Sequence, residues 1–193
     1  MTDVERRREA VLAGHQGDED TARRFLADES AVVRAAARRA LRRLGRLEED
    51  DVTVALVDRD PRARAEACAL AVDVPEADVA ALLRDEAPSV VEAAAWALGE
   101  RGDVAAVPAL AEVATSHEDG LCREAAVAAL GAIGDESGLP AILAAMSDRA
   151  TVRRRAVLAL APFEGPEVEA ALTKAANDRD WQVRQAAEDL ITD

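Results

Sequence analysis

The chain has 193 residues, a formal net charge of −14, two Phe, two Trp and no Tyr. The negative charge repels polyanions at long range, so general binding to nucleic acid or to an anionic membrane is disfavoured. The shortage of large rings excludes a core built on aromatic side chains. Half of the residues are apolar, and most of these are Ala, Val and Leu, which favour closely packed helices.

The sequence shows no targeting or anchoring segment. No apolar run approaches the roughly 18 residues of a membrane span, and no apolar stretch follows the N-terminal arginines as it would in a signal peptide. We therefore expect a cytoplasmic protein without a membrane partner. Cys68 and Cys122 lie far apart within helical patterns, which predicts buried free thiols. Lys174 is the only lysine among 24 basic residues, which is typical of salt adaptation or of a GC-rich genome.

One helix pattern recurs along the chain at a spacing near 30 residues. A first copy, which lacks the first half of a repeat, begins at Val4. The six later copies begin at Asp28, Asp58, Asp85, His117, Ser147 and Asp178. Self-similarity at such a period is typical of repeat architectures.

Residues typical of helix ends bound each copy. The predicted N-caps, which share one offset, are Ser30, Asp60, Asp119 and Asp180. Proline follows directly in two copies, at Pro61 and Pro88, where it loses no helical hydrogen bond. The glycines predicted at or just past the far ends are Gly45, Gly99, Gly131 and Gly134.

Apolar residues recur within each copy at the three-four spacing of one helix face, as Val33, Ala36, Ala37, Ala40 and Leu41 illustrate. Shorter apolar-periodic stretches lie between the copies, at 21–27, 52–57, 79–83, 104–113, 139–146 and 168–176. Each repeat is therefore predicted to be helix, turn and helix. Because one helix pair cannot cover its own apolar face, repeats must stack. We predict an all-α superhelix, an α-solenoid of about six helical hairpins with an N-terminal capping helix, forming one repeat domain over residues 1–193.

The run from Gly102 to Met146 resembles the HEAT-like repeats grouped with phycobilisome lyases. It carries the Val-Pro-Ala-Leu first helix and an Ala-Ala-x-Ala-Ala-Leu-Gly core of the second helix. The resemblance implies a HEAT-like fold and says less about activity, since one fold hosts many functions. It implies two enzyme alternatives, a bilin-lyase-like factor and a deoxyhypusine-hydroxylase-like protein. The hydroxylase iron site uses several His-Glu pairs, whereas this chain has two histidines, His15 and His117.

The most regular charged feature is a series of arginines at one offset in the copies. Its members are Arg34, Arg64, Arg123, Arg153 and Arg184, and Val91 interrupts it. An aspartate precedes three of these arginines by six residues, at Asp28, Asp58 and Asp178. The resemblance implies an internal Asp–Arg ladder that ties one repeat to the next, and a track for anions is the alternative.

A second group of residues lies off the apolar face of the second helices. These candidate partner-binding residues are Arg38, Arg39, Arg42, Trp96, Arg154 and Leu158. Trp and Arg are the usual anchors of binding surfaces. No glycine-rich phosphate loop, Cys-x-x-Cys or His-Glu-x-x-His motif occurs, so we predict no cofactor, metal or catalytic site.

We therefore predict a non-catalytic scaffold that binds a partner protein on a concave face lined by the second helices. The alternatives are an enzyme or accessory factor of the lyase or hydroxylase type, and nucleic-acid binding through the arginine clusters.

Overall fold

The computed structural model describes residues 1–192, which contain helices and no strand. Stacked helical hairpins make this an all-α solenoid, as the repeat pattern predicts. Contacts group the chain into two compact units, unit 1 (Met1–Leu82) and unit 2 (Leu83–Asp193), and each is described by itself.

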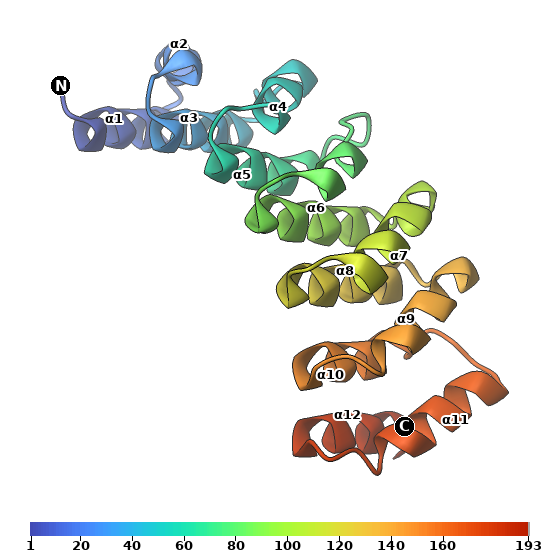
Figure 1. Cartoon of the computed structure of the whole chain (residues 1–193). Coiled ribbons are helices and arrows are strands. Elements are labelled where there is room, and N and C mark those ends of the chain that lie inside the picture. The colour runs from blue at the N-terminus through green and yellow to red at the C-terminus, as the bar shows by residue number, and fades with distance from the viewer. Residues whose placement is uncertain (193) are drawn as a thin grey trace. The chain divides into compact units, whose positions relative to one another are not determined.

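Unit 1 contains the first three of the recurring helices, α1 (Asp3–Gln16), α3 (Ala31–Leu44) and α5 (Pro61–Ala71). They pack in sequence, α1 on α3 and α3 on α5 (Figure 1). The shorter helices α2 (Glu19–Arg24), η1 (Phe25–Ala27) and α4 (Glu49–Leu56) form a second layer. Phe25 from this layer joins Ala10, Val33 and Ala36 in one buried cluster, so the two layers share a core.

Unit 2 repeats this arrangement with more copies. Its second helices are α6 (Pro88–Arg101), α8 (Gly120–Ile133), α10 (Ala150–Ala159) and α12 (Trp181–Thr192). They lie side by side, and we call them the second-helix row of unit 2 (Figure 1). The first helices are α7 (Val107–Ser116), α9 (Leu139–Ala145) and α11 (Pro166–Ala175). Single turns η3 (Val104–Ala106) and η4 (Glu136–Gly138) precede α7 and α9, and the first helix before α6 is only a 3₁₀ segment, η2 (Ala80–Arg84).

Three of the four predicted N-caps are confirmed. The carboxylates of Asp60, Asp119 and Asp180 accept the backbone N–H two residues further on, at 2.8–2.9 Å. Ser30 stands at the N-cap of α3 as predicted, but its side chain forms no capping hydrogen bond, so the expected capping interaction is wrong. The Ser30 N–H instead donates to the carboxylate of Asp28 at 2.8 Å. Pro61 and Pro88 occupy the first turns of α5 and α6 as predicted.

Replacing one of these N-cap residues tests whether its side-chain hydrogen bond stabilises the start of the helix. Asp119→Ala is expected to lower the free energy of unfolding by about 1 kcal/mol, because α8 loses its N-cap acceptor. Ser30→Ala is the matched control and should change it by less than about 0.5 kcal/mol. Urea unfolding followed by circular dichroism measures both. Equal losses in the two variants would show that the capping geometry is not what matters.

The glycines serve two different purposes. Gly45 and Gly134 follow their helices in the left-handed conformation, with φ of 66° and 69°, as predicted. Gly99 and Gly131 lie inside α6 and α8, so their predicted place at the helix ends is wrong. A β-carbon on Gly131 would lie 2.6 Å from the Cα of Ala159, and one on Gly99 would lie 3.0 Å from the Cα of Ala129. These glycines therefore let neighbouring second helices approach at backbone distance.

The core is built from small side chains, as the composition predicts. Cys68 and Cys122 are both buried and free, and burial, together with the charges of Asp119 and Glu92, raises the pKa of the Cys122 thiol to about 11. Such a thiol stays protonated and behaves as a small apolar side chain. No helix within residues 1–192 combines the length and the apolar character that crossing a membrane requires.

Candidate functional site

The arginine ladder reaches forward into the following repeat. The Nε atoms of Arg34, Arg123 and Arg153 donate to the carboxylates of Asp58, Asp148 and Asp178, at 2.7, 2.6 and 2.8 Å respectively. A second guanidinium nitrogen bonds the other carboxylate oxygen in each pair. Each pair is thus bidentate, the geometry in which Arg and a carboxylate bind most strongly.

The same arginines also reach back to the start of their own repeat. Arg34 Nη1 donates to the backbone carbonyl of Asp28 at 2.7 Å, and Arg64 and Arg184 bond the carbonyls of Asp58 and Asp178 at 2.8 Å. The aspartate six residues earlier therefore supplies its carbonyl, not its carboxylate. The carboxylate partner is the aspartate of the following repeat, which for Arg34 lies 24 residues later and not six residues earlier.

Hydrogen bonding to arginine holds the carboxyl groups ionised. The Arg153 guanidinium lowers the pKa of Asp178, and the Arg123 guanidinium does the same for Asp148, with burial opposing in both cases. The Asp178 carboxylate also accepts the N–H of Asp180 at 2.8 Å, so it orders the turn before α12 as well. One side chain therefore joins two repeats and shapes the start of the next helix.

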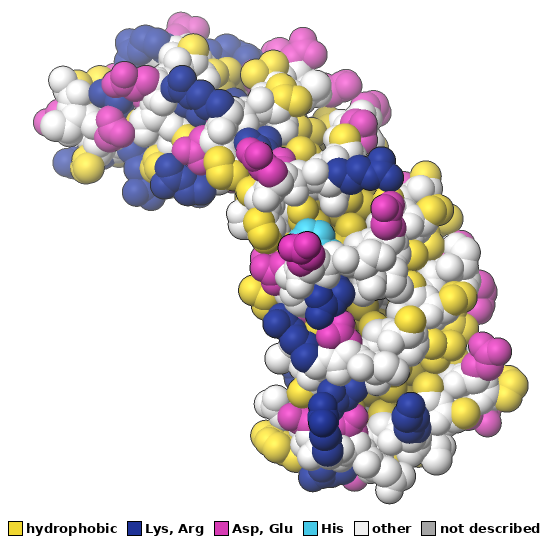
Figure 2. Space-filling model, viewed as in Figure 1, with side chains coloured by type: hydrophobic (Ala, Val, Ile, Leu, Met, Phe, Trp, Pro, Cys, Tyr) yellow, Lys and Arg dark blue, Asp and Glu magenta, His cyan; other side chains and the backbone are white. Residues whose placement is uncertain are grey.

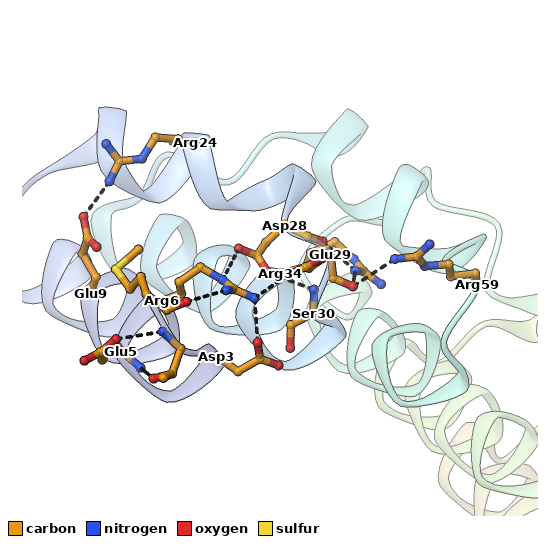
Figure 3. Close-up of polar contacts among 12 residues, drawn as sticks. Asp3, Glu5, Arg6, Glu9, Arg24, Asp28, Glu29, Ser30, Arg34 and Arg59 are labelled. Atoms are coloured by element: carbon orange, nitrogen blue, oxygen red, sulfur yellow. Dashed lines mark hydrogen bonds and ion pairs between the residues drawn. The ribbon is translucent and has the colours of Figure 1, made fainter.

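Two members of the ladder were missed in the sequence. Arg6 lies 2.9 Å from the carboxylate of Asp28, as Figure 3 shows, and extends the ladder to α1. Alignment of Val4 with Val32 places Arg6 at the Arg34 position, and that was the available signal. Asp148 follows the assigned repeat start, Ser147, by one residue, so the six-residue rule did not find it.

At one position in unit 2, the ladder lacks both its arginine and the aspartate that would pair with it. Val91, at the arginine position of α6, is fully buried. His117 occupies the corresponding aspartate position of the next repeat, and its Nδ1 accepts the N–H of Asp119 at 3.0 Å. The imidazole of His117 thus orders the turn in place of the aspartate carboxylate. Because Val91 replaces the arginine of the preceding repeat, a carboxylate at residue 117 would be a partly buried charge without the bidentate partner of the other ladder aspartates.

Arg38 is not part of a binding surface, which corrects the prediction. It is 3% exposed, and its Nε donates to the carbonyl of Asp51 at 3.2 Å. Burial lowers the pKa of its guanidinium group. The reason is its position four residues after Arg34, on the face of α3 that packs inside unit 1.

Arg39 and Arg42 are exposed as predicted, but each already has an acidic partner. Arg39 lies 2.9 Å from Glu66, and Arg42 pairs with Asp73. Both arginines help to line a hollow of about 550 Å³ beside His15 in unit 1. In the view of Figure 2, acidic and basic side chains are likewise interspersed on both units rather than gathered in patches of one sign.

Trp96 marks a second hollow, of about 430 Å³, on the second-helix row of unit 2. We call it the Trp96 hollow. It is lined by Glu92, Trp96, Gly99, Glu100, Leu121, Glu124, Ala125, Ala128, Ala129, Ala132 and Arg155. Trp96 is 48% exposed, so the predicted accessibility is confirmed. Arg154 and Leu158 on α10 are exposed as well but are not among the lining residues.

The small lining residues explain why a hollow forms here. Gly99 and Ala129 bring α6 and α8 together at backbone distance, and Ala125, Ala128 and Ala132 add only methyl groups along α8. Side chains on these helices therefore cannot fill the space between them. Of the residues that line this hollow, the sequence analysis selected only Trp96, because the alanines follow the pattern of core residues.

The described part of the chain contains no group of three or more His, Cys, Asp and Glu side chains arranged to hold a metal ion. His15 lies in α1 of unit 1, and His117 directly follows α7 in unit 2.

Solved structures similar to this chain are helical-repeat proteins. YibA of Escherichia coli is 18% identical with a TM-score of 0.68, over 98% of this chain and 82% of YibA. A designed armadillo repeat protein is 16% identical with a TM-score of 0.59, over 95% and 97%. Human deoxyhypusine hydroxylase in complex with glycerol is 19% identical with a TM-score of 0.52, over 99% and 79%. At these identities the likeness shows the fold alone.

Sequence families give a more specific result. No curated protein matches the chain significantly. The model of HEAT repeats matches residues 51–131 and 75–161, which together cover more than half of the chain. The model of the PBS lyase HEAT-like repeat matches residues 152–178. The chain is therefore a member of the HEAT-repeat family.

Proposed function

We propose that this chain is a non-catalytic scaffold that binds a partner protein on its second-helix row in unit 2. The observation that carries the proposal is Trp96, an aromatic side chain that is half exposed within a hollow. Burying an indole against a partner is a common source of binding energy, and Trp is enriched among interface anchors. Leu121, which lines the same hollow and is 52% exposed, adds apolar surface beside it.

The ladder geometry favours this proposal over an anion track. The guanidinium groups of Arg34, Arg123 and Arg153 are bonded both to a carboxylate and to backbone carbonyls. A phosphate or nucleic-acid ligand would have to displace these bonds. The surface arginines Arg39 and Arg42 face acidic partners in the same way. Nucleic-acid binding through the arginine clusters is therefore disfavoured, and the lyase-like and hydroxylase-like alternatives rest on resemblance alone.

Photocrosslinking in cells of the source organism tests the proposal. A benzophenone amino acid replaces Leu158, exposed on the second-helix row, or Val104, exposed on η3 in the other layer. We expect a discrete protein adduct from position 158 only. Trp96→Ala should abolish this adduct, whereas Trp181→Ala, a change of the same size at an exposed position outside the hollow, should leave it unchanged.

Adducts of equal yield from positions 158 and 104 would contradict the proposed face. An adduct that survives Trp96→Ala would contradict the role of the hollow. Circular dichroism of each variant establishes that its helical content is that of the wild type.

A further inference from the structure

We propose that the Trp96 hollow recognises a basic segment of its partner protein, with an arginine or lysine side chain lying over Trp96. This inference rests on the proposed function and adds the chemistry of the partner.

The lining of the hollow is acidic. Glu92, Glu100 and Glu124 line it against a single arginine, Arg155, which lies 3.6 Å from Glu124. Among residues 1–192, Glu92 and Glu100 form no ion pair. The partly buried carboxylates of Asp58, Asp148 and Asp178, in contrast, each bind an arginine of the ladder. The hollow thus concentrates negative charge that the chain itself does not balance.

Of the three glutamates, Glu92 is partly buried and also has other negative charges close by. Burial raises the pKa of its carboxyl group, with the nearby charges of Asp119 and Glu124 adding to the effect. A carboxylate that is partly withdrawn from water and close to like charges is stabilised by any cation that comes near it. A guanidinium or ammonium group in the hollow would supply that cation.

Trp96 lies between two of these carboxylates on one face of α6. Residues 92, 96 and 100 follow the four-residue spacing that places side chains above one another on a helix. A cation over the indole face gains cation–π attraction, and its charged end remains within reach of a carboxylate on either side. The methyl groups of Ala125, Ala128 and Ala132 offer an apolar floor for the aliphatic stem of an arginine or lysine.

The same features disfavour other occupants. A phosphate-bearing or acidic ligand would meet three glutamates and one arginine, and like-charge contacts act against wrong partners. A purely apolar segment would leave the glutamates desolvated without a partner. A basic segment with an apolar neighbour satisfies the acidic lining and the indole together.

Selection from a random peptide library displayed on phage tests the inference on the purified full chain. We expect the enriched peptides to carry arginine or lysine beside apolar residues. A synthetic peptide of the enriched sequence should bind about tenfold more weakly to the Glu92→Gln, Glu100→Gln, Glu124→Gln variant and to Trp96→Ala. It should bind Trp181→Ala as it binds the wild type. Added salt should weaken its binding to the wild type.

Enrichment of acidic or uncharged peptides would overturn the inference, as would the absence of enrichment on the wild-type chain. Equal binding to the triple glutamine variant would overturn it too. These outcomes are distinguishable from failure of the proposed function, because the crosslink from position 158 requires a partner at the second-helix row whatever its charge. A crosslinked partner combined with no preference for basic peptides would reject the inference alone.

Discussion

Asp58→Ala is expected to lower the free energy of unfolding by about 3–5 kcal/mol. The variant leaves the Arg34 guanidinium without its carboxylate partner in a place where both side chains are less than a tenth exposed. It also removes the acceptor for the N–H of Asp60, at 3.0 Å, at the start of α5. Breaking a buried pair by removing one partner is costly because the other charge stays buried.

Urea unfolding of the full chain, followed by circular dichroism, measures this loss. The matched control is Asp73→Ala, which removes an aspartate from a pair with Arg42 whose side chains are about half exposed. Exposed pairs contribute little, so the control should lose less than about 1 kcal/mol. If the two variants lose similar amounts, the ladder is not what holds neighbouring repeats together.

The ladder also sets a direction for the dependence of stability on pH. Burial raises the pKa of Asp58. The hydrogen bonds from Arg34 and from the N–H of Asp60, together with the charges of Arg34 and Arg38, outweigh burial, so its folded-state pKa lies below the ordinary value. The contribution is therefore present above the unfolded pKa of about 3.9 and is lost as the pH falls through the folded value. The wild type should lose this part of its stability on acidification, and Asp58→Ala should not.

Gly131→Ala is expected to destabilise unit 2 by about 2 kcal/mol. The new β-carbon would lie 2.6 Å from the Cα of Ala159 and 3.0 Å from its carbonyl oxygen, so α8 and α10 must separate. Overpacking of this kind costs about 1–3 kcal/mol, and contact with backbone favours the upper end. The better helix propensity of alanine returns up to about 1 kcal/mol, which does not outweigh the clash.

Tryptophan fluorescence follows this transition, because Trp96 and Trp181 both belong to unit 2. Gly131→Ala combined with Ala159→Gly removes one of the clashing carbons and should recover part of the loss. A stabilised Gly131→Ala variant would mean that the two helices are not in backbone contact.

Much of the fold followed from the sequence because the repeat supplies the same signal several times. Helix spacing, Pro61 and Pro88, and the aspartate caps agreed across copies, and the short first helices were found to within a few residues. Gly99 and Gly131 were misplaced because a glycine near a helix end usually terminates it. Their actual role depends on the alanine of a neighbouring helix, which the spacing within one helix does not reveal.

The candidate site was harder to predict because it depends on contacts between repeats. Arg38 was chosen for its charge, although the matching residues in the next four copies, Cys68, Ala95, Val127 and Val157, are apolar and buried. That comparison was the signal that could have excluded it. Trp96 was selected because it lies off the apolar face of its helix and because Trp is a usual anchor of binding surfaces. Glu124 comes from a different helix, so its place beside Trp96 required the packing of α8 on α6.

Hydroxyl-radical footprinting of the complex with the crosslinked partner, once purified, tests most directly whether the Trp96 hollow is the part of the second-helix row that binds the partner. The method reports side-chain accessibility, and the chain offers two exposed tryptophans, one in the Trp96 hollow and one at the start of α12. We predict that the partner protects Trp96 strongly and leaves Trp181 oxidised at the rate of the free chain. Equal oxidation of Trp96 in the free and bound states would contradict the account.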